Sequence, residues 1–225
     1  MKELARKAFG GFVRLFVTLA AMLFLPVWTL RYWQAWVFLC AFFLPALGIT
    51  LYVMKHDPAL FERRVHGGAS DEKSRTQRVI HSLVAIAFLA VVLVPPIDHR
   101  LGWSRVPAYV CVTGDFLVAA GFAFIFFVFK ENSFASGTVM VAEEQRVIST
   151  GPYAMMRHPM YTGSIVMLLG VPLALGSWWG LLAIVPFTIV ILWRLLDEEK
   201  FLARNLPGYS EYQNKVRYRL VPLVW

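Results

Sequence analysis

The sequence predicts an all-α, polytopic membrane protein, and three observations carry this prediction. Apolar residues make up 58% of the 225-residue chain and charged residues only 16%, which is too few charges for an ordinary globular domain. Several apolar runs reach about the 20 residues that a helix needs to cross a bilayer. The segments between these runs are polar. The chain is therefore expected to fold as a bundle of membrane-spanning helices.

The first half of the chain is predicted to contain four spans. The basic start leads into an apolar run too long for a signal peptide, so this run is expected to remain as the first span. The third span is expected to end at Pro95 and Pro96, because proline cannot donate the next helical hydrogen bond. Residues 1–129 thus form a four-span region, with spans at about 12–30, 33–54, 79–94 and 108–129.

The second half, residues 130–225, is organised differently. Residues 130–162 are polar and contain no stretch able to cross a bilayer. Residues 163–193 form an apolar run too long for one upright span, and prolines and glycines interrupt it. This pattern predicts a helical hairpin that turns near Gly176 to Trp179. Residues 194–225 form a charged and aromatic tail.

The formal charge of +8 does not indicate a nucleic-acid partner, because the basic residues lie at the borders of the apolar runs. Their bias towards one face predicts cytoplasmic N- and C-termini, and a bacterial inner membrane is the expected location. Cys40 and Cys111 both lie inside apolar runs. They are therefore expected to be packing residues rather than disulfide partners or metal ligands.

The densest group of chemically useful residues precedes the hairpin. Pro159 is predicted to begin a helix, because proline is favoured at the first helical position. A helix N-terminus favours a carboxylate, and Arg157 and His158 would add to this preference. The alternative is an interfacial anchor, with Arg157 near lipid phosphates and Tyr161 in the aromatic belt.

A second group lies where the last apolar helix leaves the hydrocarbon. Arg194 is followed by Asp197, Glu198 and Glu199, and Arg194 and Glu198 share a helix face because they are four residues apart. Glu198 and Glu199 lie about 100° apart around a helix, so they are expected to have different roles. The alternative is a surface ion pair of small energetic value.

A cationic turn and an acidic helix end on one membrane face suit a zwitterionic, cationic ligand such as S-adenosylmethionine. Its carboxylate needs Arg or His donors, its amino group and ribose need carboxylates, and its sulfonium is attracted to aromatic faces.

The stretch GPYAMMRHPMYTG, followed by an apolar hairpin and RLLDEEKFLARNLPGYSEYQNKVRYRLVP, resembles the C-terminal signature of the isoprenylcysteine carboxyl methyltransferase and phospholipid N-methyltransferase superfamily. The resemblance covers about 100 residues, within which the two motifs occur in the family's order. It implies an integral membrane methyltransferase that uses S-adenosylmethionine. The cofactor residues that it implies are Val147, Gly151, Tyr153, Arg157, His158, Pro159, Tyr161, Gly163 and Glu199. The catalytic candidates are Arg194, Glu198 and Glu199. We assign Glu198 to the acceptor side and Glu199 to the cofactor.

The expected acceptor is lipophilic, because it must reach a membrane-embedded site. A carboxylate acceptor would need a cation such as Arg194 to orient it, whereas an amine would need a base such as Glu199. No metal is expected. The sequence decides neither the acceptor nor the oligomeric state.

Two other function classes remain open. One is a sterol-type membrane reductase that uses NADPH. The other is a non-enzymatic transporter or scaffold, for which Asp115 in the fourth span is the best support, since an ionisable group inside a membrane is costly. We expect Asp115 to be paired with a neighbouring helix or a backbone group instead.

Overall fold

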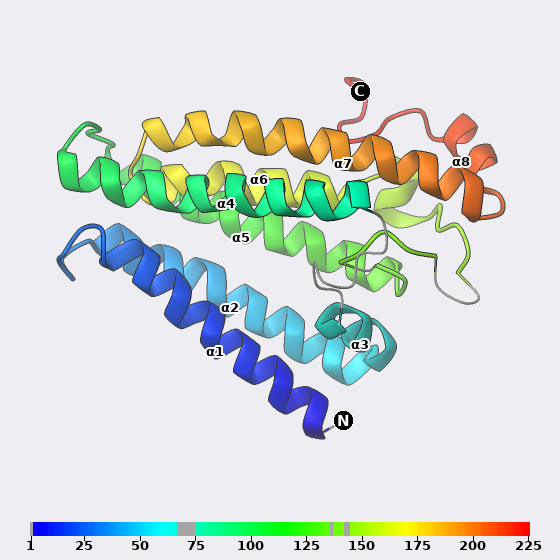
Figure 1. The fold of residues 1–225 in the computed structure, drawn as a ribbon, viewed down its shortest axis with the longest axis horizontal. Helices are drawn as coiled ribbons and strands as arrows, with labels where there is room; N and C mark the ends of the chain where they lie inside the picture. The colour runs from blue at the N-terminus through cyan, green and yellow to red at the C-terminus, as the bar shows by residue number, and fades with distance from the viewer. Residues whose placement is uncertain (1, 67–74, 136, 142–144) are drawn as a thin grey trace.

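The computed structural model describes residues 2–66, 75–135, 137–141 and 145–225. Its regular elements in these ranges are all helices. Helices α4 to α7 run side by side along the longest axis of the molecule, and α1 and α2 are inclined to them in this view (Figure 1). The α-helices are α1 (Lys2–Phe24), α2 (Trp33–His56), α3 (Pro58–His66), α4 (Arg75–Leu101), α5 (Ala108–Glu131), α6 (Pro159–Ala174), α7 (Ile184–Asn205) and α8 (Tyr209–Lys215), and two short 3₁₀ helices are η2 (Gly151–Ala154) and η3 (Trp179–Ala183).

Five of the described helices are long and apolar enough to cross a membrane, namely α1, α2, α4, α5 and the continuous run from η3 through α7. The protein is thus an integral membrane protein of the all-α class, as predicted. The hairpin of α6 and α7 is present, and it turns at Gly176, whose φ of +73° is a conformation that glycine adopts readily. Its first arm, however, has only 16 residues, which is shorter than a full crossing.

Two predicted spans had the wrong boundaries. The first helix covers Lys2–Phe24 rather than 12–30, because its basic first turns are helical and the chain leaves the helix just before Pro26. The third predicted span does not end at Pro95 and Pro96, since α4 continues through both prolines to Leu101. Both prolines are buried, so packing against the bundle compensates for the hydrogen bonds that they cannot donate.

The helices alternate in direction and thereby sort the connections to two ends of the bundle. Both termini, α3, the polar segment before α6, and α8 lie at one end, on the right in Figure 1, and we call this the polar end. The connections around residues 25–32, 102–107 and 175–178 lie at the opposite end. The sequence-based expectation that the termini share one face of the membrane agrees with this arrangement. Within the expected 55–78 loop, residues 67–74 lie outside the described part of the chain.

Helices α5 and α6 pack with their backbones in close contact. A Cβ atom on Gly114 would lie 2.2 Å from the backbone nitrogen of Ala174, and one on Gly170 would lie 2.5 Å from the carbonyl oxygen of Gly114. Nearer the polar end, a Cβ on Gly121 would lie 2.8 Å from the carbonyl oxygen of Gly163. Small residues at these positions allow the close approach that stabilises helix pairs in membranes. This packing fixes where α6, and the motif at its start, lie relative to α5.

A buried aspartate fixes the end of the bundle opposite the polar end. Asp98 accepts hydrogen bonds from the backbone nitrogen and hydroxyl of Ser104 at 2.8 and 2.6 Å, and from the hydroxyl of Ser177 at 2.5 Å. These bonds join the α4–α5 connection to the turn of the hairpin. Asp98 therefore has a structural role that the sequence analysis did not identify.

Asp115 does not have the expected partner. Its carboxylate is buried on α5, and neither oxygen has a hydrogen-bond partner among the described residues. The expectation of a pairing with a neighbouring helix or backbone group was therefore wrong. Backbone N–H groups inside a helix are already committed to helical hydrogen bonds, so the adjacent backbone offers a carboxylate no donor.

Candidate active site

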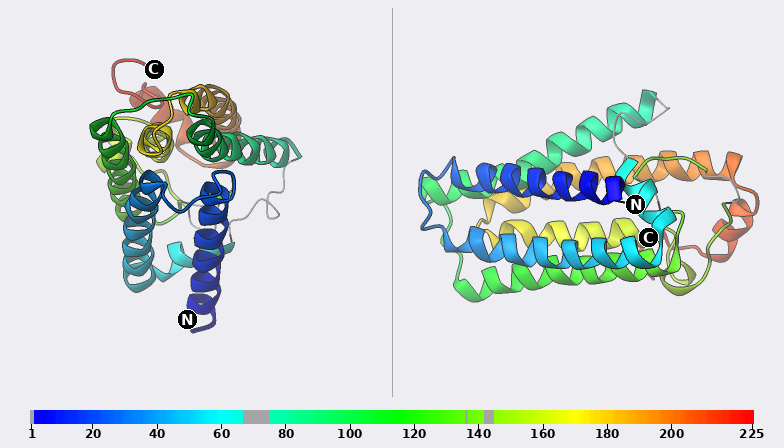
Figure 2. Two further views of the ribbon diagram at one scale, coloured as in Figure 1. Left: turned by 90° about the vertical axis from the view of Figure 1, so that its left-hand side faces the viewer. Right: turned by 90° about the horizontal axis from the view of Figure 1, so that it is seen from below.

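A cavity of about 590 Å³ opens at the polar end of the bundle. Its walls come from α4, α6 and α7, from the segments on either side of η2, and from α8. End-on and from below, α4 to α7 lie together, with α1 and α2 beside them (Figure 2). The cavity therefore brings together the two motif regions, which lie about 40 residues apart in sequence.

The lead-in turn is held by two tyrosines. Tyr212 on α8 donates its hydroxyl to the carbonyl oxygen of Tyr153 at 2.8 Å, and the hydroxyl of Tyr153 accepts a hydrogen bond from Asn132 at 2.9 Å. Burial raises the pKa of Tyr153 to about 12 and also raises the pKa of Tyr212. Both phenols are therefore neutral at physiological pH. Gly151 starts η2 with a φ of +55°, beside the side chain of Glu131.

The start of α6 agrees with the prediction for Pro159, which occupies the first helical position after His158. The backbone N–H groups of Arg157 and His158 donate to the carbonyl oxygens of Tyr218 and Arg219, both at 2.9 Å. Tyr218 and Arg219 in the tail therefore lie directly beside the start of α6. These two N–H groups bind the tail rather than a ligand.

Glu199 lies in a cluster of three cationic or potentially cationic side chains. Arg157 Nε lies 2.7 Å from Glu199 Oε1, as an ion pair without an aligned hydrogen bond. His158 Nε2 lies 3.2 Å from the same oxygen, and Arg219 Nε donates to the other oxygen at 3.1 Å. The side chains of Arg157 and Glu199 are each only 7% exposed. This cluster joins the start of α6, the end of α7 and the tail.

A second network lies on the cavity side of α7. The hydroxyl of Tyr161 donates to Glu198 Oε2 at 2.5 Å and accepts a hydrogen bond from Arg194 Nε at 3.1 Å. Arg194 also donates to the carbonyl oxygen of Gly137 at 2.7 Å. Its Nη1 lies 3.1 Å from His81 Nδ1, and since arginine has no acceptor, that histidine nitrogen must be the acceptor. Tyr161 therefore links Arg194 to Glu198.

The two glutamates face different surroundings, as their helical spacing predicted. Arg194, Glu198 and Leu202 all line the cavity and form one helix face. Of the other sequence-predicted residues, Val147, Tyr153, Arg157, His158 and Tyr161 also line the cavity. Gly151, Pro159, Gly163 and Glu199 are not among the described lining residues. Gly151 starts the turn of η2, and Pro159 begins α6. Gly163 packs against α5, and Glu199 pairs with the cluster that contains Arg157.

The sequence analysis missed two participants, His81 and Arg219. His81 lies on α4, far from both motifs in sequence. Arg219 lies in the tail, and only the folding of the tail over α6 brings it to Glu199. No local sequence signal marks either contact.

Comparison with known proteins finds a match for the region that supplies most of the lining of this cavity. Residues 109–207 match the phospholipid methyltransferase family. A 91-residue stretch is 29% identical to the Delta(14)-sterol reductase TM7SF2 of Mus musculus, and it covers 39% of this chain but only 22% of that relative. The match to the methyltransferase family includes both the RHPMYTG block and the paired glutamates. Residues 109–207 are therefore similar to the phospholipid methyltransferase family, in agreement with the resemblance inferred from the sequence.

Proposed function

We propose that the protein is a membrane methyltransferase that transfers the methyl group of S-adenosylmethionine to a lipophilic acceptor. The observation that carries this proposal is the convergence of the two motifs on one cavity. The start of α6 contributes Arg157, His158 and Tyr161, and the end of α7 contributes Arg194 and Glu198. The family match over residues 109–207 supports a methyltransferase with a lipid substrate.

The residues of the cavity fit the cofactor chemically. Arg157 and His158 could bind its carboxylate, Glu198 could bind an amino or hydroxyl group, and the rings of Tyr153 and Tyr212 could face its sulfonium. When bound, the cofactor would supply an electrophilic methyl group. We assign Glu198 to ligand contact and Glu199 to the support of Arg157 and His158. This division differs from the assignment made from the sequence.

The chain's own contribution to methyl transfer is to hold the acceptor in line with the methyl group and to exclude water. Arg194 is fixed by Tyr161 and Gly137, so it could orient a carboxylate acceptor. Glu198 lines the cavity and accepts a hydrogen bond from Tyr161. Its carboxylate could therefore accept the proton of an amine acceptor. Glu199 is poorly suited to be that base, because three donors already surround it.

The polar end is assigned to the cytoplasm, where a cell keeps its S-adenosylmethionine. Lys2, Arg6 and Lys7 at the start of α1 and the basic tail agree with this orientation under the positive-inside rule. In a bacterium, the bilayer would be the inner membrane.

The sterol reductase similarity supports a second candidate, a membrane reductase that uses NADPH. Ligand binding separates the two candidates, because anything that binds only the folded state raises its thermal stability. Purified protein in detergent should be stabilised by S-adenosylmethionine and by S-adenosylhomocysteine. We expect little stabilisation by NADPH at equal concentration. Stabilisation by NADPH alone would favour the reductase and contradict the proposed function.

A further inference from the structure

One arginine lines the cavity from outside both motifs. Arg64 lies on α3, which precedes the region that matches the methyltransferase family. Its guanidinium lies over the face of Phe129 on α5, 5.1 Å from the centre of the ring. This cation–π contact orients the guanidinium at the cavity wall. Helix α3 thus adds to the cavity a cation that neither motif supplies.

The surroundings of Arg64 disfavour its positive charge. The side chain is exposed, yet burial lowers the pKa of its guanidinium. The exposed part of the side chain therefore faces the inside of the cavity rather than open solvent. The positive charge of Arg194 lowers the pKa of Arg64 further, so the two guanidiniums lie near each other. Because arginine stays protonated at physiological pH, the two charges repel unless an anion binds beside them.

The protein supplies Arg64 with no anion among the described residues. None of these residues forms an ion pair or a hydrogen bond with its guanidinium. By contrast, the guanidinium of its neighbour Arg63 donates to the carbonyl oxygen of Ser133 at 2.6 Å. Glu198 is the one carboxylate in the described lining, and it accepts a hydrogen bond from Tyr161. An enclosed cation without an anion is costly, so Arg64 is suited to pair with a ligand.

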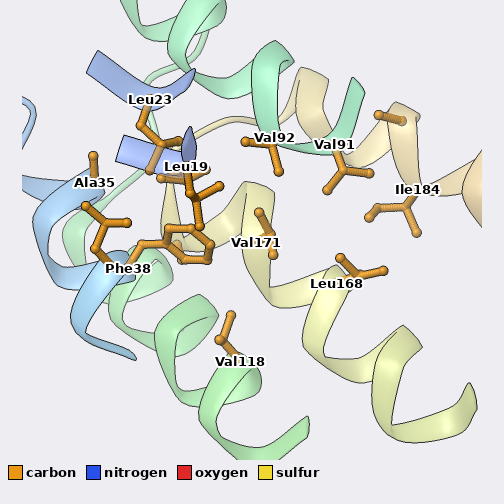
Figure 3. Packing of buried hydrophobic residues seen from close by; sticks show 14 of the residues in the cluster. Leu19, Leu23, Ala35, Phe38, Val91, Val92, Val118, Leu168, Val171 and Ile184 are labelled. Atoms are coloured by element: carbon orange, nitrogen blue, oxygen red, sulfur yellow. The ribbon is translucent and has the colours of Figure 1, made fainter. Parts of the chain in front are cut away.

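An anionic group can approach Arg64 only from the polar end. Below the cavity, Val91, Val171 and Ile184 pack in the main hydrophobic core, and their exposed fractions are 0%, 1% and 6%. Figure 3 shows the side chains of Val91 and Ile184 close together, near Val171 of α6. A close-packed apolar core excludes a charged group. The anion therefore stays at the polar end, where Arg64 and Arg194 lie.

We propose that Arg64 and Arg194 form a subsite for an anionic oxygen group of the methyl acceptor, either a carboxylate or a phosphate. This inference rests on the proposed function for the identity of its ligand as the acceptor. Guanidinium groups bind both anions through paired N–H donors. Arg157 and His158, which are assigned to the cofactor, do not belong to this subsite. A neutral or purely cationic acceptor would leave Arg64 without a partner, so the subsite selects acceptors by charge.

The test measures binding of octyl phosphate, octanoate, octan-1-ol and octylamine to the purified protein by isothermal titration calorimetry. The protein is in a nonionic detergent, and binding to empty micelles is subtracted. An anionic probe should bind at least about tenfold more tightly than octan-1-ol. Octylamine should bind no more tightly than octan-1-ol. Preference for one of the two anions would identify the group as a phosphate or as a carboxylate.

Substitutions of Arg64 assign the binding to the subsite. Arg64→Gln should weaken binding of the preferred anion at least about tenfold and leave that of octan-1-ol unchanged. Arg64→Lys keeps the charge without the planar fork, so it should bind with intermediate affinity. Arg78→Gln is the matched control, because Arg78 is exposed on α4 and is not among the described lining residues. It should leave the affinity for every probe unchanged.

Thermal stability without a probe separates ligand binding from a structural role of Arg64. Arg64→Gln removes a cation that has no ion-pair partner among the described residues, so the variant should be at least as stable as the unsubstituted protein. A clear loss of stability would overturn the proposal. Unchanged affinity of Arg64→Gln for both anions, or equal binding of the anions and octan-1-ol, would also overturn it. These measurements need no cofactor, so a lack of S-adenosylhomocysteine binding would refute the proposed function without affecting this result.

Discussion

Glu199→Gln is expected to destabilise the protein, whereas Glu198→Gln is expected to leave it folded and inactive. The two glutamates are adjacent in sequence but have different environments. The carboxylate of Glu199 is the common partner of Arg157, His158 and Arg219 in a cluster that is largely buried. Removing its charge leaves these donors without their anion, and breaking a buried ion pair in this way costs about 3–5 kcal/mol.

Glu198 has no such role in support of the fold. It lines the cavity and accepts a hydrogen bond from Tyr161, and a glutamine side chain can still accept that bond. Glu198→Gln should therefore keep the thermal stability of the unsubstituted protein. We expect methyl transfer to fall by about 10²-fold or more, which is the usual range for loss of an acid–base group.

Thermal unfolding in detergent and methyl-transfer rates distinguish the two roles. Glu3→Gln is a matched control, because Glu3 forms an exposed pair with Lys7 and its loss should not measurably affect either quantity. If Glu199→Gln were as stable as the unsubstituted protein, the cluster around Glu199 would not hold the tail and the helices together. If Glu198→Gln kept full activity, Glu198 would have no role in the reaction.

Gly114→Ala is expected to be the most disruptive small substitution in the membrane region. The added methyl group would lie 2.2 Å from the backbone nitrogen of Ala174 and 2.7 Å from the carbonyl carbon of Leu173. Backbone atoms cannot rotate away as a side chain can, so α5 and α6 must separate. Overpacking of this kind costs about 1–3 kcal/mol.

Gly48→Ala is the matched control for this prediction. Gly48 lies inside α2, and a Cβ atom there would meet nothing within 4 Å. Because glycine disfavours a helix relative to alanine, this change should stabilise the protein by about 0.5–1 kcal/mol. The two variants should therefore differ clearly in thermal stability. Equal stability would show that α5 and α6 are not held as closely as the structure describes.

The sequence predicted the features of the fold that depend on local composition. Long apolar runs identified the membrane helices, and Gly176 marked the turn of the hairpin. The end of the third span was predicted too early because packing overrides local preference there. Proline is a helix breaker in isolation, but at Pro95 and Pro96 the surrounding bundle keeps the helix intact.

The site was predictable to the same extent. The two motifs indicated which segments meet, and helical spacing indicated that Glu198 and Glu199 face different ways. Helical spacing could not indicate which of the two glutamates faces the cavity, because that depends on how α7 is rotated against α6 and the tail. The contacts of His81 with Arg194 and of Arg219 with Glu199 join positions that only tertiary folding brings together.

The most direct test of the central claim is transfer of a labelled methyl group from S-adenosylmethionine to lipid. Purified protein should be incubated with native membrane lipids and the labelled cofactor, and the label extracted into organic solvent. We expect label in the lipid fraction with the unsubstituted protein, and a loss of about 10²-fold with Glu198→Gln. In sealed vesicles, S-adenosylmethionine added outside should support methyl transfer only by protein whose cytoplasmic face points outward. An absence of lipid label from folded protein that binds S-adenosylhomocysteine would contradict transfer to a lipid, and equal label with Glu198→Gln would contradict the assigned site.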